Sequence, residues 1–161
     1  MFCLIHLWLI LKVALMFARV KSSPVPIWVN VVVIVLILFM LTEVYLHYFD
    51  HEALIDAGVT IEGDADKNVV YTTAARLLAM IAISVVALWT QKPSHLVLVL
   101  LMSVLREGQE TFIDPSFPRA DSPWSPTTVA VVQGIIVLIE IAALVAVYRI
   151  DQQQTNNGGM N

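Results

Sequence analysis

Long apolar runs alternate with short polar breaks along this chain. A hydrocarbon core about 30 Å thick is crossed by roughly 20 apolar residues in a helix, so a run of about that length predicts a transmembrane helix. Five runs reach it or come close: residues 2–18, 27–48, 69–90, 96–113 and 127–148. The pattern predicts an all-α polytopic membrane helix bundle with five transmembrane helices within residues 1–150.

The breaks between the runs favour helix ends. Proline recurs in them, at Pro24, Pro26, Pro93 and in the stretch 114–126. Because proline lacks the N–H that a continuing helix donates, these positions predict helix boundaries. After residue 150 the chain is rich in Gln, Asn and Gly, and we predict a polar, disordered tail over residues 151–161.

Composition supports the membrane interpretation. The chain is 58% hydrophobic and only 14% charged, whereas soluble domains have about 45–50% apolar and about 25% charged residues. So few charges cannot cover a water-soluble domain of 161 residues, which excludes a soluble enzyme. A net charge of -4 gives no basic surface for nucleic acid. The predicted surroundings are the lipid bilayer, with no nucleic-acid partner.

The positions of Lys and Arg predict an orientation, since cytoplasmic loops retain positive charge. Arg19 and Lys21, Lys92, and Arg149 all fall on one side of the five spans, and the acidic loop 50–67 falls on the other. We therefore expect a multi-pass protein of the plasma membrane with its N-terminus outside and its C-terminus cytoplasmic. Residues 2–18 have the alternative of a cleavable signal, but their positive charges follow the apolar run instead of preceding it, so we expect the span to be retained.

Ionisable residues inside the spans are the candidate functional residues. Each costs about 2.5–3.5 kcal/mol at the centre of a membrane, so each requires a partner or a task. They are Glu43, His47, Arg76, Arg106, Glu107, Glu110 and Glu140. At a rise of 1.5 Å per residue, Glu43, Arg76 and Glu107 all lie about 8–10 Å inside the outer ends of their spans. This predicts a single charged layer.

Helical spacing places these charges on two stripes. One consists of Glu43, His47, Asp50 and His51, and the other of Arg106, Glu107, Glu110 and Asp114. The first interpretation is a buried ion-pair network that holds the helices in register. In it Arg106 pairs with Glu110 one turn away, and Arg76 lies between the stripes and neutralises Glu43 or Glu107.

The second interpretation is a metal or proton site. Glu43, His47, His51, Glu107 and Glu110 together offer nitrogen and oxygen ligands suited to a divalent transition metal as cofactor. The two arginines nearby are poor neighbours for a cation. A third possibility is that some carboxylates are protonated. Glu140 has no basic residue at its depth, so it is protonated, paired with a partner subunit, or part of a proton path.

From residue 27 onward the chain resembles the PsiE family of small phosphate-starvation-inducible membrane proteins. The similarity lies in Glu43 and His47 near the end of one span, in the turn Lys92-Pro93-Ser94-His95-Leu96, and in Arg106 followed by Asp114. The resemblance implies four helices with both ends cytoplasmic. It carries no settled activity, so the expected function is a non-enzymatic membrane component or accessory subunit, packed against copies of itself or against another subunit of a larger membrane complex.

A second resemblance is local. Arg106-Glu107-Gly108-Gln109-Glu110 is similar to the Arg-Glu-Gly-x-Glu motif of the FTR-type iron permeases, whose glutamates are taken to handle iron. Those proteins have more helices and two such motifs, whereas this chain has one. The motif implies the alternative function, which is binding or translocation of a transition-metal ion or a proton through intramembrane Glu and His residues.

Overall fold

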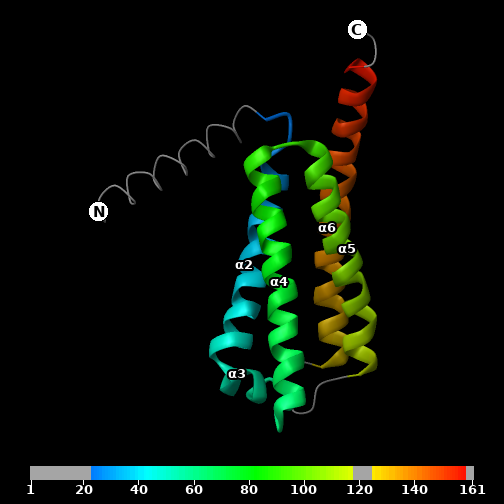
Figure 1. Cartoon of the computed structure of the whole chain (residues 1–161). Coiled ribbons are helices and arrows are strands. Elements are labelled where there is room, and N and C mark those ends of the chain that lie inside the picture. Colours follow the sequence, from blue (N-terminus) through cyan, green and yellow to red (C-terminus); the bar gives the residue numbers. More distant parts are fainter. Residues whose placement is uncertain (1–22, 118–124, 159–161) are drawn as a thin grey trace, which may run out of the picture.

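The computed structural model describes residues 23–117 and 125–158, and the regular structure of these residues is entirely helical. The helices are α2 (Ile27–Phe49), α3 (His51–Asp56), α4 (Asp64–Thr90), α5 (Pro93–Ser116) and α6 (Pro126–Gly158). The four long helices stand side by side and alternate in direction, and α3 is a short helix at one end (Figure 1). The predicted all-α fold is confirmed. The predicted span over residues 2–18 lies outside the described residues.

The chain is a membrane protein. Three described helices, α2, α4 and α6, are long and apolar enough to cross a membrane. α5 has the length, but its second half carries four charged residues, so by the same measure it does not join them: Arg106, Glu107, Glu110 and Asp114. The described helices thus match three of the five predicted spans in length and composition.

The start of α4 shows how a polar side chain extends a helix beyond its apolar run. The Asp66 carboxylate accepts hydrogen bonds from the backbone N–H of Glu62 at 3.0 Å and of Gly63 at 3.3 Å. These bonds cap the first turn, where acidic side chains also interact favourably with the helix dipole. The helix therefore begins at Asp64, five residues before the predicted span.

The end of α6 differs from the prediction. We predicted a disordered tail from residue 151, but α6 continues to Gly158, with residues 152–157 exposed. Gln and Asn do not break a helix as proline does. The Thr155 hydroxyl also donates a 3.0 Å hydrogen bond to the Asp151 carbonyl inside this segment. Residues 159–161 lie outside the described part of the chain.

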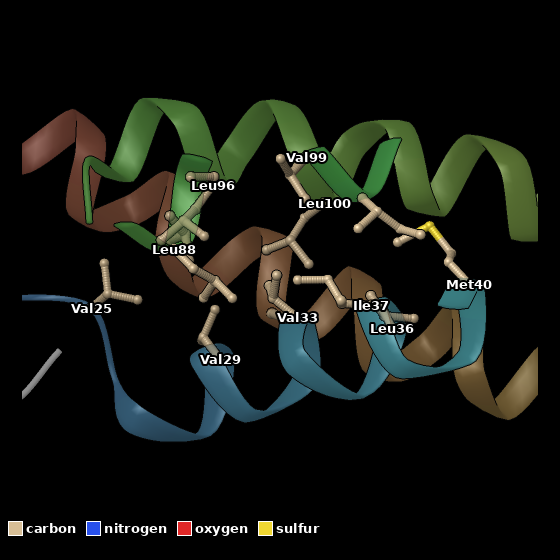
Figure 2. Packing of buried hydrophobic residues seen from close by; sticks show 14 of the residues in the cluster. Val25, Val29, Val33, Leu36, Ile37, Met40, Leu88, Leu96, Val99 and Leu100 are labelled. Atoms are coloured by element: carbon tan, nitrogen blue, oxygen red, sulfur yellow. The ribbon is translucent and has the colours of Figure 1, made fainter. Parts of the chain in front are cut away.

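The core is an apolar seam between the helices. On α2 the buried positions recur every three or four residues, as a helix with one inward face requires: Val29, Val33, Leu36, Met40 and Val44. They form one buried cluster with Leu88 of α4 and with Leu96, Val99 and Leu100 of α5, most of which is drawn in Figure 2. The outer surface is apolar too, since Leu38 and Phe39 are 57% and 59% exposed, which suits a helix surrounded by lipid tails.

A buried polar pair, Asn30 and Gln91, lies at the end of the apolar seam next to the α4–α5 turn. Gln91, in the left-handed conformation with φ 51°, ends α4. Its Nε2 donates to Asn30 Oδ1 at 2.9 Å and to the Leu88 carbonyl at 2.7 Å. Both side chains are buried. The hydrogen bond therefore ties the first turn of α2 to the turn that reverses the chain.

Candidate functional site

Arg106 is the centre of a charged cluster between α2 and α5. Its Nη2 lies 2.9 Å from Glu107 Oε1 and 3.3 Å from Glu43 Oε2, and its Nε donates to Glu110 Oε1 at 3.1 Å. The predicted i,i+4 pair of Arg106 and Glu110 is therefore present. The Arg106 side chain is only 20% exposed and that of Glu107 14%. Three carboxylates thus surround one guanidinium that is largely removed from solvent.

The cluster lines a cavity of about 220 Å³ between α2, α5 and α6. Its polar lining residues are Glu43, Ser103, Arg106, Glu107, Glu110, Asp114 and Gln133. Asp114 accepts a 2.7 Å hydrogen bond from Gln133 Nε2, which joins the end of α5 to the first turns of α6. Four carboxylates and one arginine therefore face the same space, so this cavity carries an excess of acidic groups.

Glu140 lies behind this cavity and is fully buried, with 0% of its surface exposed. Its Oε1 accepts a 2.8 Å hydrogen bond from the Ser103 hydroxyl, while its Oε2 has no hydrogen-bond partner within residues 23–117 and 125–158. Ser103 lies one turn before Arg106 and Glu107 and faces the cavity. Its hydroxyl is therefore the group that stands between Glu140 and the charged cluster.

The structure does not assemble the predicted metal ligands. His47 Nδ1 lies 2.7 Å from the Glu43 carbonyl, and His51 Nε2 lies 2.9 Å from the His47 carbonyl, so both imidazoles bond to the backbone of their own segment. Among the described residues, no group of three or more His, Cys, Asp and Glu side chains could hold a metal ion. The guanidinium of Arg106 occupies the position between Glu43 and the α5 glutamates that the metal hypothesis gave to a cation.

Arg76 lies at the predicted depth but faces the wrong way for the predicted role. The rings of Tyr48 and Tyr71 stack at 5.7 Å, which sets the register of α2 against α4. Glu43 precedes Tyr48 by five residues and Arg76 follows Tyr71 by five, so the two residues are level on antiparallel helices. Arg76 is nevertheless exposed, because α4 buries Ala74 and Leu77 instead. No described ion pair joins it to Glu43 or Glu107, and Arg106 takes that place.

Three polar contributions to this region and to the opposite end of the bundle were not predicted from the sequence. They are the Ser103 hydrogen bond to Glu140, the Gln133 bond to Asp114, and the Asn30–Gln91 pair. The inward position of Ser103 did have a signal, because Ser103 shares the helical stripe of Glu107, Glu110 and Asp114. In all three hydrogen bonds the partner comes from another segment of the chain, and the sequence pattern carries no periodic signal for it.

No family model, no curated protein and no solved structure matches this chain. The two resemblances to the PsiE family and to the iron permeases therefore stay predictions, carried by the residues quoted for them.

Proposed function

We propose that α5 crosses the membrane together with α2, α4 and α6, and that the protein is a PsiE-like, non-enzymatic component of the membrane. The support for a fourth span is the direction of its side chains. Ser103, Arg106 and Glu107 turn toward the cavity, whereas Leu98 and Leu105, each 58% exposed, face outward. Lipid would therefore meet an apolar surface on α5 although four charged residues lie in the second half of this helix.

The role of the cluster in this proposal is to set how the helices pack. The observation that carries it is the contact of one arginine with a carboxylate of α2 and two carboxylates of α5. An unpaired charge in a low-dielectric bundle is costly, so a sliding or rotated α2 that separates Glu43 from Arg106 is penalised. The cluster thus selects one register among apolar helices that could pack in several.

The test of this role combines metal analysis with stability. Purified protein should contain no stoichiometric transition metal, and Glu43→Gln should unfold more easily than wild type, while the exposed Glu52→Gln serves as a matched control with no such loss. A stoichiometric metal that is lost in His47→Ala but kept in His95→Ala would overturn the proposal in favour of a metal site. Unchanged stability in Glu43→Gln would overturn the structural role of the cluster.

The second candidate function is proton uptake, and the burial of Glu140 favours it. A proton that enters the acidic cavity can reach Glu140 through the Ser103 hydroxyl, which accepts one proton while it donates its own to Glu140 Oε1. Within the described chain this route stops at Glu140, because the next buried side chains along α6, Ala143 and Val147, are apolar. The arrangement therefore fits proton binding from one side better than passage across the membrane.

Proteoliposomes test whether a proton bound at Glu140 goes on to cross the membrane, which the apolar seam opposes. If the protein moves protons, acidification of the interior after an imposed pH gradient should exceed that of empty vesicles and fall to their level in Ser103→Ala and Glu140→Gln. Rates equal to those of empty vesicles for the wild-type protein would reject proton transfer across the membrane and leave the structural role in place.

A further inference from the structure

Arg76 is an exposed cation in the middle of an apolar helix surface. It is seven residues, or about 10 Å, past Val69, where the apolar run of α4 begins. On the same face lie Thr72 one turn before it, Ala79 one turn after it, and Ile83, which is 48% exposed. A guanidinium in contact with lipid tails at this depth is costly, so this position requires an anionic partner.

The acidic cavity has an excess of negative charge, opposite in sign to the charge of Arg76. Four carboxylates line it with Arg106 as their one described basic partner. The cavity reaches the surface between α2 and α6, at Phe39 and Glu43, where the Phe39 residue is 59% exposed and the Glu43 side chain 42%. The mouth thus offers a carboxylate that a cation from outside the molecule can approach.

These two features lie at one depth and on different sides of the bundle. Arg76 is level with Glu43, as the Tyr48–Tyr71 stack shows. Around the bundle the contacting pairs give the order α2, α4, α5, α6. Ile83, on the face of Arg76, lines a small cavity together with Val99 and Met102 of α5. The cation therefore faces away from α2, on the α4–α5 side, whereas the cavity opens on the α2–α6 side.

We propose that Arg76 of a second copy enters the mouth of the acidic cavity and pairs with Glu43, so that the charged cluster is completed between two subunits. Copies inserted in the same orientation hold equal depths, so the cation of one and the carboxylates of the next meet without tilt. The small Thr72 and Ala79 beside Arg76 allow close approach of the helices. The inference rests on the proposed membrane bundle and names its partner.

The contact is head-to-tail because the two surfaces differ. Such heterologous contacts repeat from copy to copy and give rings or rows, whereas a two-fold dimer would bury one patch against itself. Cross-linking distinguishes these cases. With Cys3→Ser as background, the double variant Phe39→Cys with Ala79→Cys places one thiol beside the cavity mouth and one beside Arg76, at matching depth.

Oxidation of this double variant in native membranes should yield a ladder of dimers, trimers and larger species, while each single-cysteine variant should give no ladder. Adding Arg76→Gln should reduce the ladder at least fivefold, and Arg76→Lys should retain a substantial part of it. Lys67→Gln, an exposed cation at the start of the same helix, is the matched control and should leave the ladder unchanged.

The inference is overturned by an absent ladder, by a ladder that survives Arg76→Gln, or by a single dimer band formed by Ala79→Cys alone. If Arg76 pairs with a lipid phosphate instead, no ladder should form. External labelling of Gly63→Cys in the same membranes keeps the outcomes separate. A correctly labelled protein without a ladder rejects the subunit contact alone, and a wrongly labelled one rejects the proposed bundle.

Discussion

Arg106 Nη2 lies 3.3 Å from Glu43 Oε2, although 63 residues separate them in the chain. This contact joins the last third of α2 to the second half of α5, two helices that are not neighbours in sequence. Around it, Glu107 and Glu110 add two further carboxylates from α5. The most polar helix of the bundle is thus fixed to the most apolar one by charge, in a region where apolar packing alone would allow several registers.

The first prediction concerns coupling within this cluster. Arg106→Met should lower the free energy of unfolding by about 2–4 kcal/mol, since it leaves the surrounding carboxylates without their cation. Breaking a fully buried ion pair costs about 3–5 kcal/mol, and the cluster around Arg106 is partly exposed. In a double-mutant cycle, adding Glu107→Gln should recover at least about 1 kcal/mol of that loss. Equilibrium unfolding in mixed detergent measures both.

The matched control for that cycle is the exposed pair of Lys67 and Asp64, which lie 3.9 Å apart near the start of α4. Lys67→Met with Asp64→Asn should show no measurable coupling, because water screens an exposed pair. Strict additivity of the Arg106 and Glu107 substitutions would mean that these two residues are not energetic partners.

The second prediction concerns the buried carboxyl. Ser103→Ala should destabilise the protein by about 1–3 kcal/mol, because Glu140 Oε1 then loses its hydrogen bond in a site without water access. Glu140→Gln keeps the size of the side chain and an oxygen that can accept from Ser103, so it should cost less than Ser103→Ala if the carboxyl is neutral in the fold. A larger loss for Glu140→Gln would show that the charged form is the native one.

The sequence predicted where the helices lie, but it predicted which side chains face inward for only some of them. α5 carries a polar stripe of Arg106, Glu107 and Glu110 on an otherwise apolar helix, so its inward face could be recognised from the sequence alone. α4 is apolar on nearly all sides, since both its buried and its lipid-facing positions favour Leu, Ile, Val and Ala. Nothing in that pattern revealed that Ala74 faces inward and Arg76 outward, so the predicted role of Arg76 was wrong.

Depth was predictable because it depends on residue count alone. A constant rise per residue places Glu43 and Arg76 at one level, and the stacked Tyr48 and Tyr71 show the same level in the fold. The partners of Glu140 and Asp114 were not predictable, because each depends on how α6 turns about its own axis against α5.

The third prediction concerns the polar closure at the other end. Asn30→Ala should cost about 1–2 kcal/mol, since it leaves the buried Gln91 Nε2 with only the Leu88 carbonyl. Asn68→Ala is the matched control, because Asn68 is exposed and its side chain accepts a 3.2 Å hydrogen bond from the exposed Thr72 hydroxyl. This substitution should change stability little. Equal losses of stability in Asn30→Ala and Asn68→Ala would show that the Asn30–Gln91 pair does not stabilise the fold.

The fourth prediction concerns topology, which the charges at the two ends of the bundle determine. Lys92 lies in the α4–α5 turn, and Arg149 lies in the last third of α6, which runs toward the same end of the bundle (Figure 1). The short helix α3 and the start of α4, which carry acidic residues, lie at the opposite end. Because positive loops stay in the cytoplasm, a reporter fused after Arg149 should be cytoplasmic. In a Cys3→Ser background, Gly63→Cys should react with a membrane-impermeant thiol reagent from outside, and Ser94→Cys should react only after the membrane is opened.

An N-terminal tag accessible from outside would support the predicted span over residues 2–18. A tag on the cytoplasmic side would mean an even number of spans and contradict it, and external labelling of Ser94→Cys would contradict the orientation as a whole.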